Sequence, residues 1–262
     1  MPASLYDAHI HLAHADLLQH KTEIAEAYAS IGVRKVVCNG TKPEDWNRVL
    51  QLAVDDPRIV PAVGLHPWNV NSAPDGWKTT FVKALDAGAQ VIGEVGLDRW
   101  IEGHDIEAQQ DAFRFQLSAA TQRNLPISIH CLRAMGPLMD TLRSVALPER
   151  GIHIHAYNGP IELIAELVAL GTVFSFNSGQ LRPDRPTVEK RIRAIPNDSI
   201  LVETDAPDFF PGDAYQEFRL INSELCHPGN IRRAYEAIAR VRACPLETFA
   251  EQVESNFIRY FE

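Results

Sequence analysis

Short apolar runs alternate with helix-like stretches along the whole chain, and this alternation constrains the fold more than any other feature of the sequence. We read eight of these runs, rich in β-branched residues, as strands: Leu5–His11, Lys35–Asn39, Ile59–Leu65, Val91–Val95, Ile127–His130, Ile152–His155, Val173–Phe176 and Ile200–Glu203. Helices are expected at Leu18–Ile31, Pro43–Val54, Trp77–Asp86, Met135–Ser144, Pro160–Leu170, Thr187–Ile195 and Pro228–Val241, after the N-cap Asp105, and from Pro245 onward. Strands separated by helices pair in parallel through right-handed crossovers. The sequence therefore predicts an α/β fold, a (β/α)8 TIM-type barrel, with room for distortion.

The length of the chain fits one such barrel. It has 262 residues, of which 45% are hydrophobic and 23% are charged, and a (β/α)8 domain typically needs about 250. We find no internal repeat, low-complexity tract or linker. A single domain spanning residues 1–262 is therefore expected.

The start of the chain and its cysteines indicate a cytoplasmic protein. The first four residues lack the basic and apolar segments of a signal peptide, and no apolar run approaches the length of a membrane span. The cysteines form no CxxC pair, and a chain of this size does not need disulfides, so we expect reduced thiols. We expect no membrane association and see no sign of an obligate protein partner.

The net charge excludes one class of nucleic-acid-binding protein. At −9, the chain is too acidic to coat nucleic acid nonspecifically. A nuclease is still compatible with this charge, because bound metal ions and a local basic rim can hold a few phosphates.

Six side chains of metal-ligand type stand at the ends of the expected strands. They are His9, His11, Glu94, His130, His155 and Asp205. The carboxyl ends of all strands in a β/α barrel meet at one face, where active sites lie. Strand side chains alternate between faces, so His9 and His11 point the same way, about 7 Å apart at their Cα atoms. Four imidazoles and two carboxylates predict a hydrolytic metal centre, since zinc, manganese and iron accept this mixture and a carboxylate can bridge two ions.

Each of these residues also has a structural explanation when it is taken alone. A His-x-His pair is often polar strand surface, and His130 could be a hydrogen-bonded core histidine. Glu94 could cap a helix, and Asp205 before Ala-Pro could open a turn. Gly93 and Gly96, on either side of Glu94, suggest a strand that ends there in a tight turn. These structural explanations do not account for the fact that all six residues lie at the ends of strands.

Taken together, the motifs resemble the TatD family of metal-dependent deoxyribonucleases over essentially the full length of the chain. The residues that carry the resemblance are Asp7-Ala8-His9-Ile10-His11, Gly64-Leu65-His66-Pro67, Gly93-Glu94-Val95-Gly96-Leu97-Asp98, Gln109 with Phe113, Gln116 and Leu117, Leu125-Pro126-Ile127-Ser128-Ile129-His130, His155-Ala156-Tyr157-Asn158-Gly159, Glu203-Thr204-Asp205-Ala206-Pro207, and Asn256 with Phe261. The resemblance implies a TIM-type barrel with one or two divalent cations, without distinguishing Mg, Mn, Zn, Fe and Ni. It implies that one ion binds to His9, His11, Glu94 and Asp205, and the other to Glu94, His130 and His155.

The chain departs from the family pattern in two places. The family usually has Arg two positions after the histidine of the fifth strand, where this chain has Leu132 followed by Arg133. The family's Asn-Glu-Pro near the eighth loop is replaced by Cys226-His227-Pro228. We therefore ask whether Arg133 takes over the phosphate-binding role of the missing arginine.

Further residues are assigned by their position. The candidate substrate-binding residues are His66, Arg133 and Arg99. Arg182 and Arg185 are either additional phosphate contacts or part of a solvated loop. We expect His153 to lie one layer deeper in the barrel than His155 and Glu203 to serve packing or hydrogen bonding. We expect a surface position for the histidines outside motifs, His14, His20, His104 and His227.

The predicted activity is metal-assisted hydrolysis of a phosphodiester, exonuclease-like, on DNA ends or single strands. Asp205 and Glu94 are the candidate catalytic residues, Asp205 as both ligand and proton acceptor and Glu94 as the bridging carboxylate. Two other classes of protein remain open at this point: a hydrolase of a small amide, lactone or ester, and a non-catalytic binding module.

Overall fold

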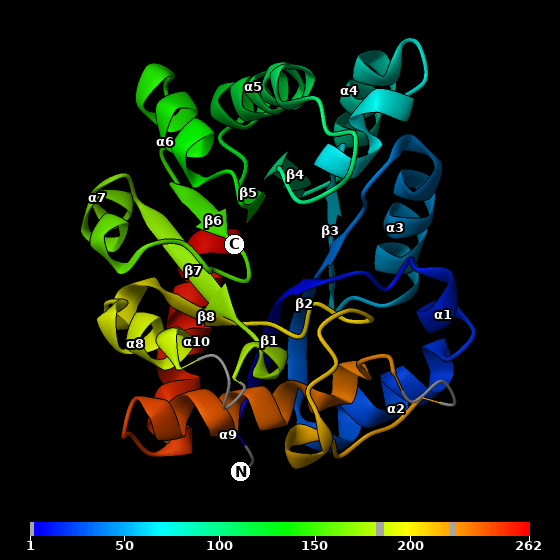
Figure 1. Ribbon diagram of the computed structural model, residues 1–262. Coiled ribbons are helices and arrows are strands. Elements are labelled where there is room, and N and C mark those ends of the chain that lie inside the picture. Colours follow the sequence, from blue (N-terminus) through cyan, green and yellow to red (C-terminus); the bar gives the residue numbers. More distant parts are fainter. Residues whose placement is uncertain (1–2, 182–185, 221–223) are drawn as a thin grey trace.

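The structure is a computed structural model that describes residues 3–181, 186–220 and 224–262. Within these residues, parallel strands follow one another around a barrel in chain order (Figure 1). They are β1 (Leu5–Ile10), β2 (Val33–Asn39), β3 (Ile59–Val63), β4 (Val91–Asp98), β5 (Ile127–Leu132), β6 (Ile152–Ile154), β7 (Thr172–Phe176) and β8 (Ile200–Val202). Every neighbouring pair from β1 to β8 is parallel, which confirms the predicted α/β barrel.

Helices surround the strands as an outer ring (Figure 1). They are α1 (Ala15–Leu18), α2 (Lys21–Ile31), α3 (Pro43–Asp55), α4 (Trp77–Asp86), α5 (Ile106–Arg123), α6 (Met135–Ser144), α7 (Ile164–Ala169), α8 (Thr187–Ala194), α9 (Ile231–Val241) and α10 (Leu246–Phe261). Asp105 caps α5 as expected, because its side chain accepts from the backbone N–H groups of Glu107 and Ala108. Among the helices described, none has the length and apolarity that a bilayer crossing requires.

Backbone hydrogen bonds join the first strand to the segment that follows the last strand. Asp205 N donates to His9 O at 2.9 Å, and His11 N donates to Ala206 O at 2.9 Å. These backbone bonds join the end of β1 to the segment that follows β8. They place His9, His11 and Asp205 side by side, although the histidines and the aspartate are almost 200 positions apart in the sequence.

The last helix, α10, covers the end of the barrel at which the strands begin. Tyr260 OH donates to Ile127 O at 2.8 Å and accepts from Ile127 N at 3.1 Å, which ties α10 to the start of β5. Glu254 accepts from Tyr6 OH at 2.6 Å, near the start of β1. The amino-terminal end of the barrel is therefore filled, and the carboxyl end remains for a site.

The expected fourth strand was too short. We expected it to stop at Val95 with a tight turn, but β4 continues to Asp98 and stays paired with β5. Gly96 permits this pairing: its φ is +139°, and a Cβ built there would lie 2.0 Å from His130 O. Glycine therefore serves close approach of two strands here, and not a turn.

Three expected helices also differ from the structure, and one of them, Pro228–Val241, begins with a 3-10 turn at Pro228–Asn230 before α9. The stretch Leu18–Ile31 forms two helices, α1 and α2, which are separated at Gln19 and His20. The stretch Pro160–Leu170 begins with a 3-10 turn at Ile161–Leu163 before α7.

Candidate metal centre

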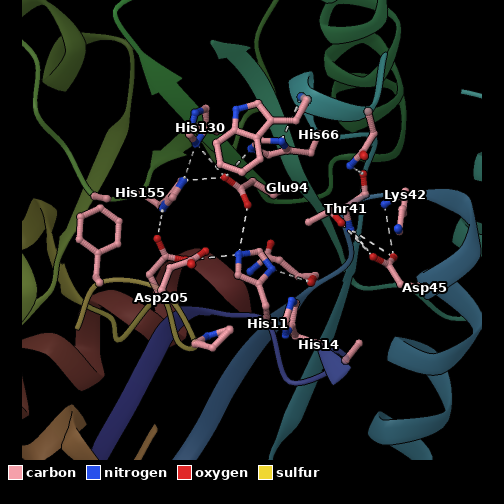
Figure 2. Close-up of a pocket in the computed structure, with 18 of the residues that line it drawn as sticks. His11, His14, Thr41, Lys42, Asp45, His66, Glu94, His130, His155 and Asp205 are labelled. Atoms are coloured by element: carbon pink, nitrogen blue, oxygen red, sulfur yellow. Dashed lines mark hydrogen bonds and ion pairs between the residues drawn. The ribbon is translucent and has the colours of Figure 1, made fainter. Parts of the chain in front are cut away.

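The carboxyl end of the barrel holds a cavity of about 770 Å³, and Glu94 lies at its centre (Figure 2). Glu94 Oε1 is 2.8 Å from His155 Nε2 and 3.0 Å from His130 Nδ1. Glu94 Oε2 is 3.3 Å from both His9 Nε2 and His11 Nε2. The two carboxylate oxygens therefore face two different pairs of imidazoles, which is the arrangement that a bridging carboxylate needs.

Asp205 completes the group around His9 and His11. Its Oδ1 lies 3.6 Å from His9 Nε2 and 3.3 Å from His11 Nε2, and the two Nε2 atoms are 3.3 Å apart. Donor atoms bound at 2.0–2.2 Å to one tetrahedral ion lie roughly 3.3–3.6 Å apart. These three side chains could therefore hold a divalent ion without large movement. His9, Glu94 and His155 form an overlapping group.

Hydrogen bonds on the far side of two rings determine which nitrogen is free to bind metal. His11 Nδ1 is 3.1 Å from Asn39 O, and a carbonyl oxygen only accepts, so in the neutral ring Nδ1 carries the proton and Nε2 is free. His130 Nε2 donates to Asp98 Oδ2 at 2.8 Å, which leaves Nδ1 free. In both rings the free nitrogen is the one that faces Glu94. Such a carboxylate or carbonyl partner is common behind metal-bound histidines.

A chain of hydrogen bonds fixes His9 in the same way. Glu203 Oε2 accepts from Ser175 Oγ, so Ser175 Oγ accepts from His153 Nε2, 2.6 Å away. His153 Nδ1 then lacks a proton and accepts from Ser128 Oγ at 3.1 Å. Ser128 Oγ in turn accepts from His9 Nδ1 at 2.9 Å. His9 Nε2 is therefore left with a free lone pair, directed toward Glu94 and Asp205.

His66 has the opposite arrangement. Its Nδ1 accepts from Trp68 N at 3.1 Å, so the neutral ring carries its proton on Nε2, which lies 3.3 Å from Glu94 Oε1. A protonated nitrogen donates and does not bind a metal. His66 is thus suited to hydrogen bonding within the cavity, in keeping with the substrate contact expected from the sequence.

Burial and mutual charge shift the ionisation of the cluster. Burial raises the pKa of Asp205 to about 6, although the neighbouring His11 opposes the rise. Burial also opposes ionisation of Glu94, but the histidines around it outweigh burial and hold its pKa well below the usual range. Burial would lower the pKa of His11, but Asp205 and Glu94 raise it well above its usual value. The two carboxylates thus favour a positive charge beside them, and a divalent cation would supply that charge.

Two carboxylates that support the centre were not assigned a role from the sequence. Asp98 is buried, and the hydrogen bond from His130 helps to hold its pKa below the usual range against the effect of burial. Asp7 accepts from Thr204 N at 3.0 Å and from Thr204 Oγ1 at 2.6 Å, beside Asp205. Asp7 and Asp98 both lie in motifs that carry the family resemblance. A carboxylate in an apolar strand, a few residues from a metal ligand, was the sequence signal that could have predicted their supporting role.

The rim of the cavity carries cationic, aromatic and apolar side chains. Lys42, Arg48, Trp68, Trp100 and Leu132 line it. Arg99 and Arg133 are exposed and are not among the described lining residues, so their substrate-binding role stays a prediction. Arg182 and Arg185 lie outside the described residues.

His227 was expected at the surface, and this is wrong. Its side chain is fully buried, Nδ1 accepts from Gly229 N at 2.9 Å, and the ring stacks on Phe218. The residue therefore caps the turn Pro228–Asn230 before α9. His153 and Glu203 lie buried in the hydrogen-bond chain behind His9, in agreement with the roles expected for them.

Comparison with known proteins gives a consistent result along the whole chain. A family model described as TatD related DNase matches residues 6–262. The chain is 26% identical over 258 residues to the uncharacterized metal-dependent hydrolase YjjV of Escherichia coli K12, covering 97% of this chain and 96% of YjjV. It is 25% identical over 272 residues to human deoxyribonuclease TATDN3, covering 98% of this chain and 94% of the human protein.

Solved structures show the same similarity in the fold. The crystal structure of YjjV, a TatD homologue, superposes with a TM-score of 0.89, covering 100% of this chain and 99% of YjjV at 26% identity. A hydrolase of the TatD family from Entamoeba histolytica superposes with a TM-score of 0.86 at 16% identity, covering 100% of this chain and 99% of that one. The single barrel domain is therefore shared over its full length.

Proposed function

This chain belongs to the family of TatD-related DNases, and we propose on that basis that it is a divalent-metal-dependent phosphodiesterase that cleaves DNA at ends or in single strands. The observation that carries the proposal is the position of Glu94, whose two carboxylate oxygens face two separate pairs of histidine nitrogens. A human relative named deoxyribonuclease supports the choice of substrate.

The proposed ligands form two sets that share Glu94. The first ion would be held by His9, His11, Glu94 and Asp205, and the second by Glu94, His130 and His155. When bound, divalent cations polarise a phosphoryl oxygen and lower the pKa of a coordinated water from about 15.7 toward ~7.

The protein's own side chains bind and orient the substrate and move the proton. Asp205 Oδ1 faces His11, while Oδ2 lies on the other side, 3.8 Å from His155 Nδ1. Asp205 can therefore ligate through one oxygen and accept the proton of the attacking water on the other. His66 Nε2–H donates to an oxygen of the phosphodiester. Lys42 and Arg48 on the rim hold the flanking phosphates by charge.

The distribution of charge favours a short contact with DNA. The net charge is −9, and the cations that line the described cavity are few, so tight binding along an intact duplex is disfavoured. An end or an unpaired strand needs only a few phosphate contacts near the centre. Four free cysteines fit a reducing compartment, and we propose the cytoplasm.

The test is a matrix of substrates and ions. The substrates are linear single-stranded DNA, circular duplex DNA, a simple phosphodiester, an amide and a lactone, each with Mg²⁺, Mn²⁺, Zn²⁺, Fe²⁺ or Ni²⁺. We expect hydrolysis of the linear single strand and of the phosphodiester, and its loss with a chelator. Faster turnover of the amide or lactone would instead place the protein with other amidohydrolase-like enzymes, and equal cleavage of circular duplex would contradict the preference for ends.

A further inference from the structure

Two exposed tryptophans lie next to each other on the wall of the cavity. Trp68 is 45% exposed and Trp100 is 55% exposed, and both line the cavity. Their ring centroids are 6.2 Å apart with an angle of 35° between the planes. Large aromatic side chains usually bury their area, so a pair exposed at the mouth of a functional cavity indicates a binding surface.

The position of this pair is fixed relative to the metal centre. Trp68 Nε1 donates to Asp98 Oδ2 at 2.7 Å, and Trp100 N donates to Asp98 Oδ1 at 2.6 Å. The same Asp98 Oδ2 accepts from His130 Nε2 at 2.8 Å. The centroid of the Trp68 ring is 6.4 Å from that of His130. The Asp98 carboxylate therefore fixes the position of the two tryptophans relative to His130, a proposed metal ligand.

We propose that Trp68 and Trp100 form a stacking site for one unpaired nucleobase next to the cleaved phosphodiester, an inference that rests on the proposed function. Every base offers a flat π-face to an aromatic side chain, so such a site accepts any sequence. A base within a duplex is already stacked and paired, and it must leave the helix to reach the indoles. The site therefore selects frayed ends and single strands.

The charges across the cavity fit the strand that would carry such a base. Figure 2 shows Lys42 on the side of the cavity away from His130, and Arg48 also lines the cavity. The base is held on the aromatic wall, the phosphodiester at the centre, and the next phosphate near these cations. This order is that of a nucleotide chain, in which bases and phosphates lie on different sides of the sugar.

The test compares two strands and three variants. One strand is a short single-stranded oligonucleotide, and the other carries an abasic nucleotide at the cleaved end. Trp100→Leu removes the exposed ring but keeps the backbone N–H that Asp98 accepts. Trp68→Phe keeps a ring but loses the donor to Asp98. The control is Trp77→Leu, because Trp77 packs against Phe81 and Phe115 and is not among the described residues that line the cavity.

We expect the abasic change to raise KM about tenfold in the wild type, which corresponds to about 1.4 kcal/mol of stacking. Trp100→Leu should raise KM for the normal strand by a similar factor and remove the difference between the two strands. Trp68→Phe should lower kcat more than it raises KM. Trp77→Leu should keep the wild-type ratio between the KM values of the abasic and the normal strand. Equal KM values for the two strands in the wild type, or an unchanged ratio in Trp100→Leu, would overturn the stacking site.

Binding measurements separate this inference from the proposed function. Fluorescence anisotropy of the same labelled strands reports affinity without cleavage. Failure to cleave either strand with any ion would count against the proposed function. Equal affinity for the normal and the abasic strand would count against the stacking site, whether or not cleavage occurs.

Discussion

His130 donates its Nε2 proton to Asp98 at 2.8 Å, and this single bond decides that Nδ1, 3.0 Å from Glu94, is the nitrogen available to a metal ion. Asp98 receives donors on both oxygens, from His130 and Trp68 on one and from Trp100 N and Ile101 N on the other. Only a carboxylate can accept on both sides.

Asp98→Asn should therefore weaken the second metal site. The amide has one donor group, which must face His130 or the backbone N–H groups. Facing His130, it favours a proton on Nδ1 and blocks ligation there. We expect metal affinity to fall about 10- to 100-fold at one of two sites, measured by calorimetric titration with Zn²⁺ or Mn²⁺. Asp45→Asn is the control, because Asp45 bonds to Thr41 and Lys42 and not to a histidine. Equal effects of the two substitutions would contradict the role of Asp98.

Ser128→Ala should allow His9 to adopt the tautomer with its proton on Nε2. The hydroxyl is the acceptor for His9 Nδ1–H and the link to His153. Without it, the proton of His9 can move to Nε2 and donate to Glu94. Nitrogen NMR of histidine-labelled, metal-free protein should show His9 protonated at Nδ1 in the wild type and shifted toward Nε2 in the variant, with roughly tenfold weaker metal binding. Thr172→Val removes another buried hydroxyl, one without a partner among the described residues, and should change neither readout. An unchanged His9 signal in Ser128→Ala would exclude the hydrogen-bond chain.

Asp205→Asn should remove nearly all hydrolysis while the fold persists. Asp205 has a φ of +53°, a conformation that asparagine tolerates well, and the two side chains have the same shape. Asparagine cannot accept the proton of the attacking water, and loss of a general base typically costs roughly 10²–10⁴-fold in rate. Removal of one buried negative charge near Glu94 should keep or raise the melting temperature in the presence of a chelator. Turnover at saturating metal decides the matter: more than about a tenth of the wild-type rate would remove Asp205 from the mechanism.

The general architecture and the proposed ligands could be predicted because both depend on local patterns. Apolar runs of β-branched residues mark strands, and a polar residue at the end of such a run, as at His130 or Asp205, falls on the face where strands of a barrel end. The extension of β4 beyond Glu94 could not be predicted in this way. Gly96 reads as a turn in the sequence, and only the contact with His130 O shows that it serves strand pairing.

The supporting shell around the ligands depends on contacts between distant segments, which a single sequence does not reveal. Ser128, His153 and Ser175 belong to three strands, and only their side-by-side pairing joins them into one chain of hydrogen bonds. His227 was misplaced for a related reason: no local pattern indicates that Phe218 covers it.

His227→Asn should flatten the pH dependence of stability. Burial lowers the pKa of His227 from 6.5 to about 4, with the nearby Glu23 opposing the shift. Between these values the unfolded chain binds a proton that the folded chain refuses, so stability rises with pH across this window and declines as the pH falls from about 6.5 toward 4. Asparagine keeps an acceptor for Gly229 N–H and does not titrate. Loss of the stacking on Phe218 should cost about 1 kcal/mol at pH 7.

Urea unfolding of both proteins with a chelator, at pH 7 and pH 5, measures this difference, because the other histidines contribute equally to both. The variant should lose less stability than the wild type on acidification, by on the order of 1–2 kcal/mol. Parallel losses in the two proteins would show that His227 does not titrate in this range.

The central claim is that one cluster of histidines and carboxylates at the end of the barrel binds divalent ions around Glu94. Crystals grown with Zn²⁺, with diffraction recorded on both sides of the zinc absorption edge, test it directly. We predict one or two anomalous peaks, the first 2.0–2.2 Å from ligand atoms of His9, His11, Glu94 and Asp205 and the second within the same range of Glu94, His130 and His155. A fully loaded protein whose peaks lie away from Glu94, or whose His130 turns out of the cavity, would contradict the account.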